Sequence, residues 1–151
     1  MPDVALTFDY DFPSKMVYDW WTDLSGKGYI GKSLKSIRQI GKENRKIRVE
    51  TRWKVMGLTI KMIESLTMDS TKHWIWEPHM MGIHIVDDFK LDDIDGKSRL
   101  HIKSEFHPVG IKGKLARMMF GRYLRRLMTE EWISADRAFR DEARLDVQDV
   151  H

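Results

Sequence analysis

The longest regular hydrophobic pattern in the sequence runs from about Ile111 to Glu142 and has helical spacing. At about 100° per residue, seven apolar residues fall on one stripe: Phe120, Leu124, Leu127, Met128, Ala135, Ala138 and Phe139. Four arginines are placed opposite this stripe: Arg122, Arg126, Arg137 and Arg140. At about 1.5 Å per residue such a helix is about 45 Å long. It is therefore expected to cross the whole domain.

Two features depart from this pattern. Glu131 lies near the centre of the apolar stripe, where a carboxylate must be paired, be protonated, or face water or a ligand. In the first turns, four apolar residues lie on the side that later becomes basic: Ile111, Leu115, Met118 and Met119. The apolar stripe thus changes face near Gly121, which predicts a kink or a short helical flap before the main helix.

The N-terminal part has a different pattern. Residues 4–10 alternate as expected for a strand, and Pro13 suits the first position of a short helix that continues to Leu24. A second helical turn over 28–32 is a weaker prediction.

From Leu34 to Val109 the hydrophobic period is two. Turn signals at Gly41–Asn44, Met56–Gly57, Asp69–Ser70, Met81–Gly82 and Asp95–Gly96 separate six predicted strands, at about 34–40, 44–55, 58–68, 72–78, 82–93 and 98–107. With the first strand they predict a seven-stranded antiparallel sheet, one face of which is buried under the long helix. The alternation places Leu58, Glu64 and Asp87 on that buried face.

Composition narrows the class of protein. The chain has 151 residues and a mass of 17.9 kDa, which suits a single domain over 1–151. It has no cysteine, so disulfides and thiolate chemistry are excluded. No secretory leader or long apolar run is visible, and we expect a cytoplasmic protein. The net charge is +3, and residues 112–128 carry basic but no acidic side chains, which suits an anionic ligand, a membrane surface or simply a solvated helix face.

The order of these elements resembles a known superfamily. A strand, a helix containing FPSKMVYDWW, a six-strand meander, the segment PVGIKGKL and a long closing helix resemble the START-like, or SRPBCC, superfamily over residues 4–145. That superfamily includes birch-pollen-allergen relatives and polyketide cyclase-like proteins. The resemblance implies an α+β helix-grip fold, in which a curved sheet grips the C-terminal helix and leaves a cavity for an apolar small molecule. It implies no universal catalytic residue.

In such a fold the core and the ligand site overlap. The candidate ligand-binding residues are Trp53, Met62, Glu64, Trp74, Trp76, Ile85, Asp87, Phe89, Ile102, Phe106, Phe120, Leu124, Met128 and Glu131. Core packing alone also explains the tryptophans. We expect Glu64 and Glu131 to face each other across the cavity and to anchor or protonate a polar group, which makes them weak catalytic candidates. The alternative is that each pairs with a nearby donor or with water.

Several other functions are disfavoured. His79 and His84, like His101 and His107, lack metal-ligand spacing, so neither a metal nor another cofactor is expected. Nucleic acid is not expected either, because the aromatic residues alternate inward.

Three functions remain open. The first is binding or transport of a lipid-like or aromatic small molecule, and the second is polyketide cyclase-like or dehydratase-like catalysis by the cavity carboxylates. The third is a protein-interaction module, with transient membrane or protein contact through residues 111–126. The residues Ile111, Leu115, Met118 and Met119 are candidates for a gate, unless they pack beneath loops at the cavity mouth.

Overall fold

The computed structural model describes residues 2–25 and 33–149, which form eight strands and two helices. In chain order these are β1 (Val4–Tyr10), α1 (Ser14–Trp21), β2 (Leu34–Glu43), β3 (Lys46–Val55), β4 (Leu58–Ser70), β5 (His73–Glu77), β6 (His79–Met80), β7 (Ile83–Ile94), β8 (Lys97–Pro108) and α2 (Gly110–Asp149). The predicted second helical turn at 28–32 lies outside the described residues.

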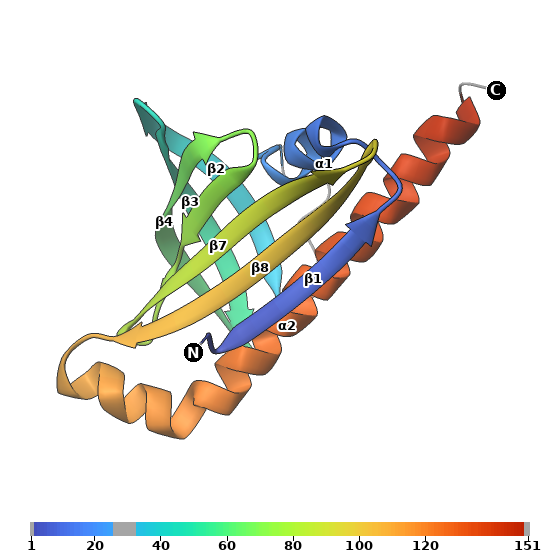
Figure 1. The fold of residues 1–151 in the computed structure, drawn as a ribbon. Coiled ribbons are helices and arrows are strands. Elements are labelled where there is room, and N and C mark those ends of the chain that lie inside the picture. Colours follow the sequence, from blue (N-terminus) through green and yellow to red (C-terminus); the bar gives the residue numbers. More distant parts are fainter. Residues whose placement is uncertain (1, 26–32, 150–151) are drawn as a thin grey trace.

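Seven strands form one continuous antiparallel sheet in the order β1-β8-β7-β5-β4-β3-β2, and the two-residue β6 pairs with β7 at its side. The sheet curves around α2, with α1 closing one end of the space between them (Figure 1). This is the predicted seven-stranded α+β arrangement, and each long strand lies within three residues of its predicted bounds.

Three of the predicted turns are tight two-residue hairpins. In each of them, both central residues have positive φ: 51° and 81° at Met56–Gly57, 54° and 76° at Met81–Gly82, and 49° and 78° at Asp95–Gly96. Such angles match the twist of neighbouring strands, and glycine adopts them without strain. Two predicted turns lie slightly too early, because β2 continues to Glu43 and β4 continues to Ser70.

Helix α1 begins directly after Pro13 and buries Val17 and Trp21. It ends at Trp21 rather than at the predicted Leu24. The indole of Trp21 lies 6.0 Å from the Phe89 ring and 6.2 Å from the Trp132 ring, measured between ring centroids. The helix therefore closes the aromatic core from one end.

Helix α2 is continuous from Gly110 to Asp149, and its first part bends away from the sheet before the main part crosses it (Figure 1). Most of the predicted stripe is buried, although Phe120 and Ala138 are only half-buried. Arg140, which the helical period places opposite the stripe, makes contacts that the period does not predict. Arg140 is half-buried, because its guanidinium donates to Asp136 and to the Asp9 carbonyl and lies over the Tyr10 ring.

One inward prediction fails. Leu58 continues the alternation of β4, but 68% of it is exposed. It directly follows the Met56–Gly57 turn, at the tip of a hairpin, where the strand has passed the part of the sheet that packs on the core. From Met62 to Leu66 the same alternation is buried.

Candidate functional site

The buried face of the sheet carries two acidic residues, Glu64 on β4 and Asp87 on β7. Their exposed fractions are 2% and 0%. Strand β5 lies between them in the sheet, and Trp76 of β5 stands directly opposite Asp87. The two carboxyls thus lie on adjoining parts of one apolar, aromatic surface.

Asp87 is partly satisfied by its own sheet. Ser104, opposite it on β8, donates a hydrogen bond from its hydroxyl to Oδ1 of Asp87. The other oxygen, Oδ2, has no hydrogen-bond partner in the described part of the chain. Burial raises the pKa of Asp87 to about 7, and the Ser104 hydrogen bond opposes this shift.

Glu64 is less well satisfied. No hydrogen bond of good geometry reaches either of its carboxyl oxygens from residues 2–25 and 33–149. Burial raises its pKa to about 8; the nearby Thr51 hydroxyl and the Trp53 and Trp76 indoles oppose the shift, and the charge of Asp87 adds to it. Near neutral pH Glu64 is therefore mostly protonated, and its neutral carboxyl both donates and accepts hydrogen bonds.

Two indole N–H groups lie near Glu64, those of Trp53 and Trp76. The Trp53 indole donates to the Thr51 hydroxyl, with 3.1 Å between Nε1 and Oγ1. The indole nitrogen of Trp76 is buried and makes no hydrogen bond of good geometry within the described residues, but it lies near enough to Glu64 to oppose the rise of the Glu64 pKa. The Trp76 N–H and the Glu64 carboxyl thus lie on an apolar surface without hydrogen bonds of good geometry. Such groups can orient an apolar ligand that has a single polar group.

Glu131 has a different environment. Its Oε1 accepts hydrogen bonds from the backbone N–H groups of Ser33, at 2.7 Å, and Leu34, at 3.1 Å. Burial raises its pKa, while these two N–H groups oppose the shift. Glu131 therefore fastens α2 to the start of β2, and the acid whose charge acts on Glu64 is Asp87.

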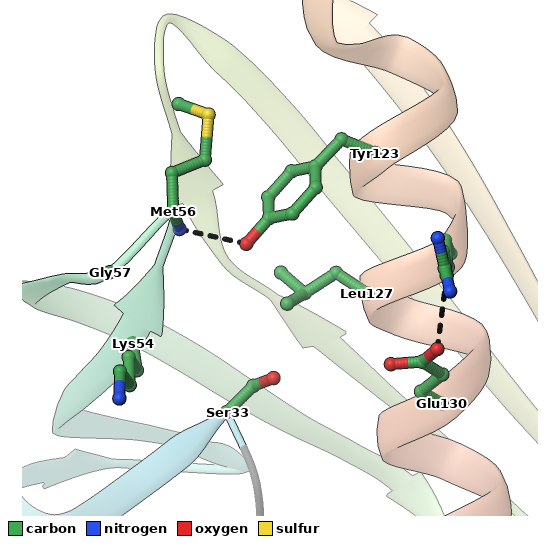
Figure 2. A pocket seen from close by; sticks show the side chains of 8 residues that line it. Ser33, Lys54, Met56, Gly57, Tyr123, Leu127 and Glu130 are labelled. Atoms are coloured by element: carbon green, nitrogen blue, oxygen red, sulfur yellow. Dashed lines mark hydrogen bonds and ion pairs between the residues drawn. The ribbon is translucent and has the colours of Figure 1, made fainter.

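A pocket of about 310 Å³ opens between α2 and the turn after β3. Tyr123 and Leu127 extend from the helix toward this turn, and the Tyr123 hydroxyl accepts a hydrogen bond of 2.8 Å from the Met56 backbone N–H (Figure 2). The remaining lining residues are Ser33, Lys54, Gly57, Arg126 and Glu130. We call this pocket the mouth.

Buried residues of the core adjoin the mouth. Leu127 lines it and is 5% exposed, and Glu131 follows one helical turn later. Trp53, next to the mouth residue Lys54, pairs with Leu34 across the sheet.

A second hollow, of about 450 Å³, lies between α1 and the later part of α2. The Trp20 indole and Phe139 line it, and the Trp20 Nε1 donates to the Glu142 carboxylate across it at 2.6 Å. It is larger than the mouth, but neither of the two buried acids lines it.

Thirteen of the fourteen predicted ligand-binding residues are buried in the described structure, and Phe120 is half-buried. The aromatic members lie close together, for example Trp74 stacked on Phe89 with 5.4 Å between their ring centroids.

The four predicted gate residues are exposed, by 79% for Ile111, 49% for Leu115, 76% for Met118 and 68% for Met119. The alternative interpretation, that they pack beneath loops at the mouth, is wrong. The bend of α2 carries these turns beyond the edge of the sheet (Figure 1).

Sequence reasoning missed Trp132 and most of the mouth. Trp132 is 4% exposed and meets Phe89 edge-on, with ring centroids 5.1 Å apart. Its position one turn after Met128 lies on the helical stripe, so the period alone could have found it. The mouth combines residues from β3, α2 and the start of β2, and no local pattern brings these together.

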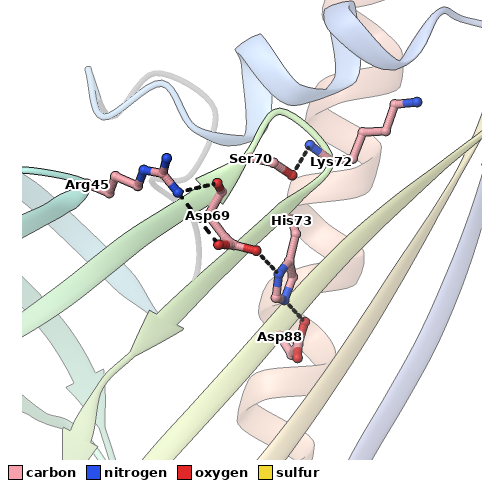
Figure 3. Close-up of polar contacts among 6 residues, drawn as sticks. All are labelled: Arg45, Asp69, Ser70, Lys72, His73 and Asp88. Atoms are coloured by element: carbon pink, nitrogen blue, oxygen red, sulfur yellow. Dashed lines mark hydrogen bonds and ion pairs between the residues drawn. The ribbon is translucent and has the colours of Figure 1, made fainter.

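The outer face of the sheet carries a separate polar cluster. His73 bridges Asp69, at 3.0 Å, and Asp88, at 2.9 Å, while Arg45 contacts the Asp69 carbonyl (Figure 3). These contacts fasten the β4–β5 hairpin to β7. No group of three or more metal-ligating side chains with suitable geometry occurs in the described ranges.

Comparison with solved structures decides the fold. The protein TTHA0849 of Thermus thermophilus matches with a TM-score of 0.71 and 16% identity, over 91% of this chain and 94% of that one. The Zhui aromatase/cyclase of Streptomyces sp. R1128 matches with a TM-score of 0.71 and 14% identity, over 95% and 94%. Ara h 8.0201 matches with a TM-score of 0.66 and 12% identity, over 91% and 99%. The chain has the helix-grip fold.

The helix-grip assignment rests on structure alone. No protein-family model matches the sequence, and the comparison with curated proteins gives no match. A START superfamily protein of Mycobacterium smegmatis shares the fold as well, with a TM-score of 0.63 at 11% identity over 87% of this chain and 92% of that one. None of the described helices combines the length and the apolarity needed to cross a membrane.

Proposed function

We propose that this helix-grip protein binds a hydrophobic small molecule between its sheet and α2, with Glu64 as the polar anchor. The observation that carries the proposal is the unpaired Glu64 carboxyl on a buried aromatic surface. A buried polar group without a hydrogen bond lowers the stability of the folded protein, and a ligand that supplies the missing hydrogen bond recovers that loss.

The mouth is the proposed point of entry. Its volume of about 310 Å³ lies at the lower end of small-molecule sites, which span about 300–1,000 Å³. Leu127 is its buried apolar wall, and Met62 and Met128 lie in the same core. Methionine side chains repack readily, so the interior is expected to widen around a guest.

The expected ligand has an apolar aromatic or lipid-like body and one polar group. The indoles of Trp53, Trp74 and Trp76 would contact the body. Because protonated Glu64 both donates and accepts, a hydroxyl, a carbonyl or an N–H group suits the polar end. Asp87, whose Oδ2 is unpaired among the described residues, would contact the same polar group of the ligand.

A second candidate function is acid–base catalysis on such a molecule. It is favoured by the burial of Glu64 and Asp87, which raises their pKa values to about 8 and about 7 and so suits proton transfer near neutral pH. A cyclase-like or dehydratase-like reaction would use one acid to donate a proton and the other to accept one. Replacement of Glu64 by glutamine would then abolish turnover while changing the affinity little.

The test is a fluorescence titration with N-phenyl-1-naphthylamine, a neutral aromatic probe that has one N–H donor. We expect saturable binding to the wild-type protein, and an affinity about tenfold lower in Glu64→Leu, which removes the acceptor. Glu105→Leu is the matched control, since Glu105 is exposed on β8. Failure of the wild-type protein to bind, or an equal effect of both variants, would overturn the proposal.

A further inference from the structure

The first turns of α2, residues 110–122, expose a continuous apolar face. We call this segment the flap. Ile111, Leu115, Met118 and Met119 are all at least 49% exposed. At helical spacing they lie within an arc of about 100°. From Leu124 to Ala143 the apolar residues of α2 are buried or half-buried, so the continuous outward apolar face ends with the flap; Leu145, near the C-terminal end of α2, is 60% exposed.

The orientation of the flap is fixed by close backbone packing. Gly113 is buried against Gly82 in the β6–β7 turn, so closely that a Cβ on Gly113 would overlap the Gly82 carbonyl oxygen. The same oxygen accepts a 2.8 Å hydrogen bond from the Val109 N–H. On the inner side Arg117 donates to Asp3 at 3.0 Å. The flap is therefore held by its small and polar side, and its apolar side faces away from the protein.

The charges around this face have one sign. Lys112 and Lys114 flank it, and Arg122 lies two helical turns beyond Leu115 on the same side. None of these three has an ion-pair partner in the part of the chain that the structure describes. The sequence has no aspartate or glutamate from 106 to 129. An apolar strip bordered by cations is complementary to a surface that has an anionic outer layer and an apolar layer beneath it.

We propose that the flap docks on an anionic lipid bilayer, with Ile111, Leu115, Met118 and Met119 inserted among the acyl chains. Lys112, Lys114 and Arg122 then contact the lipid head groups. A folded protein partner would require acidic side chains facing these cations around a matching apolar groove, whereas an anionic bilayer presents both features everywhere on its surface.

The flap and the mouth are continuous. Tyr123 follows the flap directly and is tied by its hydroxyl to the Met56 N–H at the mouth. Across the mouth, at the β3–β4 hairpin tip, Met56 and Leu58 are 49% and 68% exposed. Docking would thus hold the mouth close to the bilayer, so that an apolar ligand need not cross water. This last step rests on the proposed function, whereas the docking itself does not.

The test is flotation of the full chain with phosphatidylcholine vesicles that contain about a third phosphatidylserine. We expect binding to these vesicles and binding weaker by about tenfold or more to pure phosphatidylcholine or at high salt. Met118→Ser together with Met119→Ser is expected to reduce binding by about tenfold or more. Ile63→Ser is the matched control, since Ile63 is 52% exposed on the outer face of β4.

Two results would overturn the docking proposal. One is absence of binding to the anionic vesicles, or binding that the double methionine variant retains in full. The other is a dimer of the wild-type protein in solution that the double variant loses, without vesicle binding, because the flap would then be a protein interface. The probe titration is read separately: vesicle binding without probe binding contradicts only the proposed function.

Discussion

The two parts of α2 present their apolar side chains in opposite directions. In the flap they point away from the protein, whereas from Leu124 to Ala143 most of them pack against the sheet and α1. Phe139, for example, meets the rings of Tyr10 and Phe12 edge-on, at 4.9 Å and 5.6 Å between ring centroids. Apolar residues therefore stabilise the fold in the main part of α2, whereas in the flap they are free to contact another surface.

The difference follows from the reach of the sheet. The main part of α2 crosses its concave face, while the flap contacts the β6–β7 turn through Gly113 and Asp3 through Arg117. Apolar residues beyond the sheet contribute little to folding. Their presence on the flap indicates a role outside the folded core.

The largest expected effect concerns the main part of the helix. Trp132→Ala should lower the free energy of unfolding by about 3–5 kcal/mol, because it leaves a cavity among Phe89, Trp21 and α2. Urea unfolding followed by circular dichroism measures this loss. A change below about 1 kcal/mol would show that the interior is loosely packed around this residue.

The next effect concerns the interior acid Glu64, whose replacement is expected to increase the free energy of unfolding. Folding raises the Glu64 pKa from 4.5 to about 8, so its neutral form stabilises the folded state fully below pH 4.5 and this contribution is lost as the pH rises to about 8. Glu64→Gln keeps a neutral amide at every pH. It should therefore be more stable than the wild-type protein at pH 8, by about 4 kcal/mol, and less distinct from it at pH 5.

Thermal unfolding of both proteins at pH 5 and pH 8 tests this prediction. Glu105→Gln, on the exposed face, serves as the control and should show no such pH dependence. A Glu64→Gln variant that is less stable than the wild-type protein at pH 8 would mean that the carboxylate has a partner in the folded state.

Replacement of Glu131, unlike that of Glu64, is expected to lower the stability of the protein. Glu131→Ala removes the acceptor of the Ser33 and Leu34 N–H groups and should lower stability by about 1–3 kcal/mol. Chemical denaturation measures the loss, and hydrogen exchange at the Leu34 amide should become faster. Unchanged exchange there would show that another group replaces the carboxylate.

The smallest stability effect is expected in the flap. The double variant Met118→Ser, Met119→Ser should change the free energy of unfolding by less than about 0.5 kcal/mol, because both side chains are exposed. Denaturant unfolding of the monomer checks this directly. A loss approaching that of Trp132→Ala would remove the distinction between the two parts of α2.

The sequence period predicted the fold well, because strand alternation and the helical stripe are local consequences of burial. It also identified the exposed apolar residues of the flap as unusual. It failed at Leu58, where exposure depends on where the sheet ends, and it did not indicate the contacts of Arg140 with Asp9 and Tyr10 of β1.

The site was predicted less completely. The alternation placed Glu64 and Asp87 on one face, but the helical stripe could not show that Glu131 has backbone partners at the start of β2. The mouth depends on Tyr123 contacting a turn that lies 67 positions away in the sequence. Such contacts follow from the tertiary arrangement and not from any short pattern.

The central claim, that the interior holds an apolar guest, is tested most directly by native mass spectrometry after incubation with N-phenyl-1-naphthylamine. We predict a complex of one probe molecule per chain, absent under denaturing conditions and weakened in Glu64→Leu. A wild-type protein that shows only the mass of the bare chain at saturating probe would contradict the claim.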